Sequence, residues 1–244
     1  MVLKRFVRTF FILVPVLLLV FQIFWPATIP KPPKFQIALK AILPPIGFIF
    51  HYIDFNQKNA LSKWEEKIFQ GKSAYWIEFT KSSGFVHSSS QAAASAIFYR
   101  IKYNIHNYPH VSWKWKIKKF PQKDGVTDLK KRDDFAARFY VVFLSRFFTN
   151  FRCVEYAWDE TLPEGTVLDS PYTDQIKQMI IQSGQAPQGQ WVSETRNVEE
   201  DYEKLFGEKP KMKVAAIALM TDSEGTGAEA EAFFDDIQIG KKLR

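Results

Sequence analysis

Acidic and basic side chains stand at two places in the sequence from which they could contact a polar ligand. In the stretch RDDFAARFYVVF, Asp134 and Arg138 share a parity, so a strand would project both from one face. An acid and a base placed together can orient a sugar hydroxyl or a carboxylate, and the same pair can equally be a structural ion pair at a sheet edge. In AIALMTDSEGTG, Asp222 follows an apolar run and opens an acidic loop. We expect these three side chains to form the polar part of a ligand-binding rim.

A further acidic stretch, VEYAWDE, raises the alternative of sugar hydrolysis. Glu155 and Asp159 share one parity of this predicted strand, with Ala157 between them. Two carboxylates suffice to hydrolyse a glycosidic bond when they lie roughly 5–9.5 Å apart. A glycan-modifying hydrolase that uses Glu155, Asp159 or Asp222 as acids is therefore the enzymatic alternative. We favour a protein without catalysis, because so loose a pairing of acids is a weak signal.

Aromatic rings complete the expected rim. Tyr156, Trp158 and Trp191 fall near predicted strand ends or polar loops, where a ring face could stack on a sugar. Tyr and Trp usually bury the body of the side chain, so core packing is the default for all three. We place Tyr156 and Trp158 with the polar residues named above in the ligand-binding rim.

Strands must position these side chains, and the sequence shows several. SWKWKIK alternates Trp113, Trp115 and Ile117 with polar residues, which predicts a strand with one face in water. IFYRIKYNI and AYWIEF repeat the alternation, and IKQMIIQSG is predicted as a further strand. RFYVVFL and VAAIALM are apolar on both parities, as is typical of central strands covered on both faces. The sequence therefore predicts two packed sheets.

One short helix is predicted near the end of the chain. Asn197 is a suitable N-cap, Glu199 and Glu200 occupy the first turn, and Gly207 ends the helix. The predicted fold class is mainly β: a two-sheet sandwich with one short helix.

An apolar segment precedes the sandwich and predicts a transmembrane helix. The run FFILVPVLLLVFQIFW lies within residues 9–25, is interrupted only by Pro15 and Gln22, and follows a basic tail over residues 1–8. A signal peptidase prefers small residues just before the cut, and the candidate cut after Ala27 has a tryptophan two positions earlier. We therefore expect an uncleaved signal anchor at residues 9–25.

The remaining chain divides into a connecting segment and the folded domain. We assign residues 26–60 to a proline-rich spacer and an apolar juxtamembrane strap, and residues 61–244 to the sandwich. The strap, residues 41–53, is broken by two prolines and is too short to span a bilayer. It could pack on the domain or lie at the membrane surface. A third hypothesis makes it the surface by which a structural subunit docks to an envelope protein complex.

The net charge of +7 does not indicate nucleic-acid binding. Six of the 33 Lys and Arg residues lie at the two ends of the chain, which leaves 27 basic against 26 acidic residues between them. A basic face across the fold is therefore not required, and we expect no nucleic-acid partner. Cys153 is the single cysteine, which excludes an intrachain disulfide and a multi-cysteine metal site.

Several phrases together resemble a bacterial family. HVSWKWKI, RDDFAARFYVVF, VEYAW, GQWVSETRNVEEDYEKLFGEKP and AIALMTDSEGTGAEAEAFFDDIQIG occur in an order similar to the family known as domain of unknown function 3047. The resemblance covers roughly residues 61–240. It implies an exported or envelope-associated sandwich of jelly-roll type, similar in outline to carbohydrate-binding modules, and it implies no established reaction.

The acidic loop DSEGTG is the remaining candidate for a metal. Asp222 and Glu224 match early ligand places of an EF-hand loop, but the twelfth place, which needs a bidentate Glu, is Phe233. Some jelly-roll sugar-binding modules hold a structural calcium with an acid near the last strand, and Asp235 or Asp236 resembles that position. We expect no cofactor and no metal, with structural calcium as the alternative, and we interpret the loop as a hairpin turn between two central strands.

These observations predict a membrane-anchored protein of the bacterial inner membrane with its globular domain on the periplasmic or outer side. The basic residues before and after the apolar segment nearly balance, so the orientation depends partly on the family resemblance. The expected partners are the membrane, through the N-terminal helix, and an envelope glycan or similar polar ligand.

Overall fold

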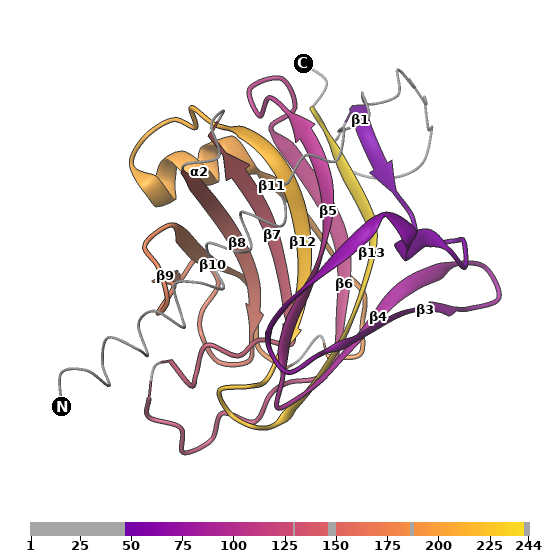
Figure 1. The fold of residues 1–244 in the computed structure, drawn as a ribbon, viewed down its shortest axis with the longest axis vertical. Helices are drawn as coiled ribbons and strands as arrows, with labels where there is room; N and C mark the ends of the chain where they lie inside the picture. Colours follow the sequence, from indigo (N-terminus) through magenta and orange to yellow (C-terminus); the bar gives the residue numbers. More distant parts are fainter. Residues whose placement is uncertain (1–46, 129, 146–149, 186–187, 242–244) are drawn as a thin grey trace.

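The computed structural model describes residues 47–128, 130–145, 150–185 and 188–241. It shows two β-sheets packed face to face, with one α-helix at one end of the sandwich (Figure 1). The prediction of a mainly-β, two-sheet sandwich with one short helix is thereby confirmed. The predicted signal anchor at residues 9–25 lies outside the described residues. Among those that are described, no helix is long and apolar enough to cross a membrane.

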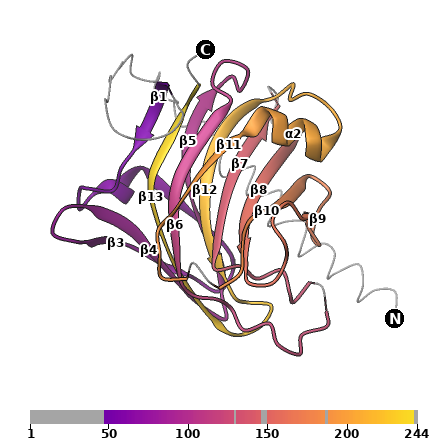
Figure 2. The same cartoon turned by 180° about the vertical axis from the view of Figure 1, so that it is seen from behind.

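The first sheet has six strands in the order β11-β6-β13-β4-β3, with β1 paired to β13. The long strand β13 pairs with β4 along its first half and with β1 along its second half. Figure 2 shows this sheet from the opposite side of the molecule. Its strands are β1 (Phe48–Ile53), β3 (Ala74–Phe79), β4 (Gly84–Gln91), β6 (His110–Lys119), β11 (Val192–Asn197) and β13 (Glu229–Lys241).

The second sheet has seven strands in the order β2-β5-β12-β7-β8-β10-β9. All neighbours are antiparallel except β8 and β10, which are parallel. Its strands are β2 (Trp64–Gln70), β5 (Ala94–Tyr103), β7 (Ala137–Leu144), β8 (Phe151–Asp159), β9 (Val167–Asp169), β10 (Ile176–Ser183) and β12 (Lys213–Asp222). A short 3-10 helix, η1 (Ala60–Lys63), precedes β2.

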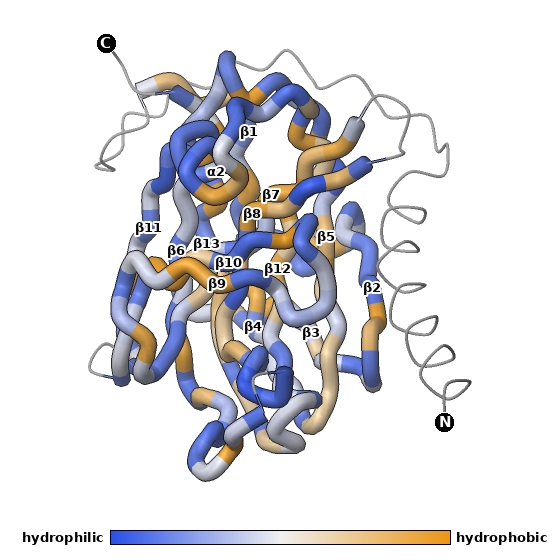
Figure 3. The backbone as a smooth tube through the Cα atoms, turned by 90° about the vertical axis from the view of Figure 1, so that its left-hand side faces the viewer, coloured by the Kyte–Doolittle hydropathy of each residue, from blue (hydrophilic) through white to orange (hydrophobic). Residues whose placement is uncertain are grey.

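The core lies between the two sheets and is rich in aromatic rings. Trp113 and Trp115 of β6 are buried, as the alternation of SWKWKIK predicts, and the Trp113 ring stacks on Phe139 of β7 at a centroid distance of 4.2 Å. Apolar segments accordingly follow the strands in Figure 3, whereas the loops at the ends of the sandwich are largely hydrophilic. Burial of these large rings is the main source of stability for a sandwich of this size.

The two strands predicted to be apolar on both parities, β7 and β12, lie side by side in the middle of the seven-stranded sheet. On each of these strands, every second side chain faces the core. The side chains between them form small apolar clusters on the outer face of the sheet, where Val142, Ala216 and Ala218 are buried. The outer face of this sheet is therefore partly covered, and polar residues on it are covered as well, including Arg138 near the start of β7.

The helix α2 (Val198–Phe206) forms where its capping residues predict it. The Asn197 side chain accepts a hydrogen bond from the backbone N–H of Glu200, and Gly207 adopts the left-handed conformation, with φ of 70°, at the C-terminal end. Val198 and Tyr202 are buried and pack the helix against the core. This packing leaves α2 at the end of the sandwich opposite the acidic loop (Figure 1).

Two expectations about connections differ from the structure. The segment Phe48–Ile53, which we expect in the apolar strap, is strand β1, so the sandwich begins before residue 61. The loop after Asp222 is not a hairpin turn, because β12 belongs to the seven-stranded sheet and β13 to the six-stranded sheet. It crosses from one sheet to the other. A hairpin turn within one sheet and a loop between two sheets can contain the same kinds of turn residue, so the sequence does not distinguish these two connections.

Candidate functional site

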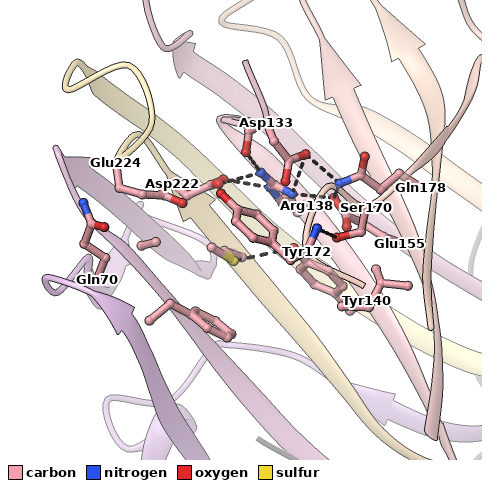
Figure 4. A pocket seen from close by; sticks show the side chains of 14 residues that line it. Gln70, Asp133, Arg138, Tyr140, Glu155, Ser170, Tyr172, Gln178, Asp222 and Glu224 are labelled. Carbon is pink, nitrogen blue, oxygen red and sulfur yellow. Dashed lines mark hydrogen bonds and ion pairs between the residues drawn. The ribbon is translucent and has the colours of Figure 1, made fainter. Parts of the chain in front are cut away.

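A cavity of about 310 Å³ lies on the outer face of the seven-stranded sheet. Its floor is formed by side chains of the central strands, and its walls come from the end of β2, the segment between β9 and β10, the loop before β7 and the loop after β12 (Figure 4). The lining residues are Phe69, Gln70, Ala94, Asp133, Arg138, Tyr140, Glu155, Ser170, Tyr172, Ile176, Gln178, Met220, Asp222 and Glu224.

Arg138 stands at the centre of the cavity floor and is almost fully buried. Its Nε lies 2.7 Å from Oδ1 of Asp222 and its Nη2 lies 2.5 Å from Oδ2, so the guanidinium donates to both oxygens of one carboxylate. On the other side, Nη1 donates to Oε1 of Glu155 at 2.8 Å, and Nη2 also donates to the backbone carbonyl of Asp133. Figure 4 shows Arg138 between these acids. Such bidentate pairs fix the orientation of both partners.

Strand order explains why these side chains meet. β7 carries Arg138 and lies between β12, which ends at Asp222, and β8, which carries Glu155. Neighbouring strands are about 4.8 Å apart, so an arginine on the middle strand reaches acids on both sides. Parity in the sequence predicts the shared face of each strand, but not which strands are neighbours.

The site is acidic, and burial raises the pKa values of its carboxyl groups. Burial raises the pKa of Glu155 to about 7 although Arg138 opposes the shift. Burial raises the pKa of Glu224 to about 7, and the negative charge of Asp134 adds to that effect. Burial also raises the pKa values of Asp133 and Asp222, again against the opposing charge of Arg138. A single arginine thus does not neutralise all the acids that surround the cavity, and the raised pKa values favour the protonated forms of these carboxyl groups.

We expect Glu155→Gln to weaken the pH dependence of stability. Because the folded-state pKa of Glu155, about 7, exceeds its ordinary value of 4.5, the native state binds the proton more tightly. The stabilising contribution of the protonated group is complete below the ordinary pKa and is lost as the pH rises from 4.5 to about 7. Between pH 5 and pH 8, wild type should lose on the order of 2 kcal/mol relative to the variant.

Urea unfolding of the full-length chain in detergent micelles at both pH values measures this difference. Glu65→Gln, in an exposed pair with Arg100, is the matched control and should follow wild type at both values. An equal pH dependence in wild type and Glu155→Gln would show that this carboxyl group does not titrate in the window.

Asp134 does not bind Arg138 but stabilises the crossing loop, which is the segment 223–228 that connects β12 to β13. Its carboxylate accepts hydrogen bonds from the backbone N–H of Gly225 at 3.1 Å, from the backbone N–H of Thr226 at 2.7 Å and from the Thr226 hydroxyl at 2.6 Å. The sequence places Asp134 and Arg138 on one strand face, but β7 begins at Ala137, so Asp134 lies in the preceding loop. Arg138 therefore pairs with Asp222 and Glu155 rather than with Asp134.

The carboxylates of Asp134, Asp222 and Glu224 come within 4.8 Å of one another and are a group of acids that could hold a cation in the described part of the chain. Arg138 already occupies both oxygens of Asp222, and the loop occupies those of Asp134. A cation would therefore have to replace existing partners, and we assign none. Asp236, considered above for calcium, instead accepts a hydrogen bond from Tyr52 and pairs with Lys114, both at 2.5 Å.

Tyr156 and Trp158 lie elsewhere than expected. Both face the core from β8 and are fully buried, so their rings cannot stack on a ligand at the cavity. The Tyr156 hydroxyl donates to Asp201 of α2 at 2.8 Å, and the Trp158 indole donates to the backbone carbonyl of Gly184 at 3.0 Å. Glu155 faces outward from β8. Because alternate side chains of a strand point to opposite faces, Tyr156 and Trp158 face inward.

Asp159 also lies apart from the cavity. It pairs with Lys123 at 2.7 Å and accepts hydrogen bonds from the backbone N–H groups of Thr161 and Leu162. Burial opposes the shift, but the Lys123 ammonium lowers the pKa of Asp159, so this carboxyl group is ionised and serves to hold a turn. Of the acids considered for hydrolysis, Glu155 and Asp222 line the cavity and Asp159 does not.

The wall residues Tyr172, Gln178 and Glu224 are not predicted as binding residues by the sequence analysis. Tyr172 is 39% exposed and lies in the segment before β10, a region without a recognisable pattern. Gln178 lies within a predicted strand, where its amide donates to Asp133 at 2.7 Å. A polar residue inside the apolar run IKQMII is the one signal that could have identified it.

Comparison with solved structures finds carbohydrate-binding modules and an endoglucanase at low sequence identity. A family 11 carbohydrate-binding module of a cellulosomal cellulase from Clostridium thermocellum is 10% identical, with 75% of this chain and 89% of that chain covered and a TM-score of 0.41. An endoglucanase from Rhodothermus marinus is 12% identical, with 79% and 96% covered and a TM-score of 0.43. These likenesses concern the fold alone.

Sequence comparison identifies the family. No curated protein sequence matches the chain. A family described as a protein of unknown function, DUF3047, matches over residues 62–238, which is more than half of the chain and agrees with the resemblance found in the sequence. The chain therefore belongs to the DUF3047 family.

Proposed function

We propose that this protein binds a saccharide without catalysis, in the cavity on the outer face of the seven-stranded sheet. The observation that carries the proposal is a cavity in which acceptor-rich polar groups and aromatic rings face the same space. Glu155 and Glu224 each offer a carboxylate oxygen that Arg138 does not hold, while Phe69, Tyr140 and Tyr172 offer apolar surface. Sugars present hydroxyl donors at their edges and C–H groups on their ring faces, which complement these two kinds of surface.

The charge of the cavity narrows the ligand class. Arg138 is the one cationic residue among the described lining residues, and its donors are engaged by carboxylates and a backbone carbonyl. An anionic ligand such as a phosphate would face four carboxyl groups and no cation whose donors are free, so it would lack a charge partner in the cavity. A neutral saccharide needs no such partner.

The proposed location is the bacterial envelope. A signal anchor at residues 9–25 would hold the sandwich on the periplasmic or outer side of the inner membrane, where envelope glycans are present. This part of the proposal rests on the apolar run of the sequence and on the basic residues before it.

Thermal unfolding of the full-length chain in detergent micelles tests the cavity. Neutral oligosaccharides of the cello-, xylo- and chito-series should include one that raises the melting temperature by several degrees, whereas oligogalacturonates should not. Tyr172→Ala should lower the affinity for the active oligosaccharide about five- to tenfold, since it removes an aromatic wall worth about 1 kcal/mol.

Phe79→Ala is the matched control, because Phe79 is an exposed ring on β3 that does not line the cavity. Its affinity should equal that of wild type. If no neutral oligosaccharide raises the melting temperature, or if Tyr172→Ala binds as well as wild type, the cavity is not a saccharide site.

Hydrolysis is the second candidate, because two carboxyl groups of the cavity, Glu155 and Glu224, have pKa values raised to about 7 by burial. A glycoside hydrolase needs one carboxyl group that stays protonated near neutral pH as general acid. Release of new reducing ends from the same oligosaccharides, abolished in Glu155→Gln, would favour the enzyme. Binding without such release supports the non-catalytic proposal.

A further inference from the structure

The outer face of the six-stranded sheet carries a row of side chains that runs across the strands. Trp76 of β3 is directly opposite His87 of β4, His87 is opposite Phe233 of β13, and Phe233 is opposite Lys116 of β6. Trp191 continues the row, since the next residue, at the start of β11, pairs with the neighbour of Lys116. These strands lie side by side in that order (Figure 2). With a strand spacing of about 4.8 Å, this aromatic row is roughly 19 Å long.

The two ends of the aromatic row are exposed tryptophans held by a buried layer. Trp76 is 40% exposed and Trp191 is 38% exposed, while His87 and Phe233 between them are buried. The Trp76 ring packs on the His87 imidazole at a centroid distance of 4.0 Å. That imidazole is fixed from both sides, because its Nδ1 lies 2.5 Å from Glu78 and its Nε2 lies 2.5 Å from Glu231. One face of Trp76 is thus supported, and the remaining surface is open to solvent.

The support of Trp191 at the other end is similar. The Lys116 ammonium lies 4.2 Å from the Phe233 ring centroid and 5.1 Å from the Trp191 centroid, within cation–π distance of both. Phe85 meets the Trp191 ring edge-on at 5.4 Å. Two large apolar rings are therefore exposed at opposite ends of one row, and each is packed on neighbouring side chains. Rings that are fixed in advance lose little conformational entropy when a ligand stacks on them.

The size of the aromatic row argues against a protein partner. At about 40% exposure, two tryptophans offer together roughly 200 Å² of side-chain surface. A specific protein–protein interface buries about 800 Å² on each partner. A ligand that is long and one ring wide fits the row better than a second folded domain does.

The charges around the aromatic row argue against an anionic ligand. The lysines of β6 on this face pair with acids of the neighbouring β13, and Lys116 is directed to the rings. These pairs are Lys114–Asp236, Lys118–Glu231 and Lys119–Glu229. Within the described residues this face therefore has no run of unpaired cations of the kind that nucleic acids or anionic lipids require. Glu78, Glu231 and Lys118 border the row and can exchange hydrogen bonds with hydroxyl groups.

We propose that the aromatic row is a second binding surface, which takes a linear neutral polysaccharide lying across the strands. The chain would stack on Trp76 and Trp191 and bridge the supported residues between them. This surface lies on the opposite sheet from the cavity and is argued from different residues, so it does not rest on the function proposed above.

Co-sedimentation of the full-length chain, in detergent micelles, with insoluble cellulose and insoluble chitin tests the proposal. Wild type should sediment with one of these polymers. Trp76→Ala and Trp191→Ala should each weaken the apparent affinity about fivefold or more, and the double variant should stay in the supernatant. Trp76→Phe keeps an aromatic ring and should recover most of the binding lost in Trp76→Ala.

Two controls separate this surface from the cavity and from misfolding. Phe79→Ala removes an exposed ring of the same strand on the other parity and should sediment like wild type. Tyr172→Ala alters only the cavity and should also sediment like wild type, even if it no longer binds soluble oligosaccharides. An unchanged melting temperature shows that the tryptophan variants are folded. The proposal is overturned if wild type sediments with neither polymer, or if the double tryptophan variant sediments as wild type does.

Discussion

Arg138→Met should lower the free energy of unfolding by about 3–5 kcal/mol. The substitution leaves three buried acids, Asp133, Glu155 and Asp222, without the guanidinium that now pairs with them. Those acids must then either bind protons or remain ionised in a medium of low polarity, and both outcomes favour the unfolded chain above the ordinary carboxyl pKa. Urea unfolding at pH 8 measures the loss.

The double variant Arg138→Met/Asp222→Leu sharpens this test. It removes the central cation together with the acid that binds it through two hydrogen bonds, so it should lose less stability than the single variant. Lys72→Met, in an exposed pair with Glu66, is the control and should change stability by about 1 kcal/mol or less. If Arg138→Met is as mild as this control, the buried network does not depend on its arginine.

Asp134→Ala should cost about 2–4 kcal/mol, since it removes three hydrogen bonds accepted by a buried carboxylate. The loop that it holds is the crossing from β12 to β13, and it also carries Glu224, one wall of the cavity. The backbone passes closely here: a Cβ added at Gly225 would lie 2.7 Å from the backbone oxygen of Lys131. The variant should therefore lose both stability and affinity for cavity ligands.

Asp134→Asn provides the graded comparison, because the amide keeps an oxygen acceptor but not both. Its loss of stability should fall between wild type and Asp134→Ala in thermal and urea unfolding. Asp128→Ala, at an exposed turn where the carboxylate accepts one backbone hydrogen bond, is the control and should lose about 1 kcal/mol or less. A loss in Asp134→Ala no larger than in this control would mean that the crossing loop holds its shape without the carboxylate.

Much of the fold follows from local patterns. The alternation of SWKWKIK correctly separates the buried from the exposed face of β6, because adjacent residues of a strand point to opposite sides whatever the strand's neighbours are. In β5 the alternation of IFYRIKYNI correctly places Ile97, Ile101 and Tyr103 in the core, but Phe98 on the opposite face is buried as well. The N-cap Asn197 and the terminal Gly207 locate α2 for a similar reason, since capping satisfies groups within a few residues. The phrases shared with the DUF3047 family are likewise a property of the chain itself.

The composition of the site was predicted only in part. Arg138 and Asp222 were identified as polar residues at the ends of apolar strands, and both line the cavity. Tyr156 and Trp158 were expected beside them but face the core, because the inward parity of β8 could not be known without its neighbours. Trp76, His87 and Trp191 look unrelated in the sequence, and cross-strand register alone brings them into one row.

By itself, then, the sequence determined the β-rich fold class, the single helix, the family and the buried face of several strands. Each of these can be inferred from patterns of residues that are close together in the chain. Only the tertiary structure decided the order of strands in the two sheets, the crossing of the Asp222 loop between them, and the partners of Arg138. Those features join residues far apart in the chain: Arg138 and Asp222 are 84 positions apart, and Phe48 and Lys241, paired between β1 and β13, are 193 positions apart. Such pairings are selected by packing of the whole domain rather than by any local preference.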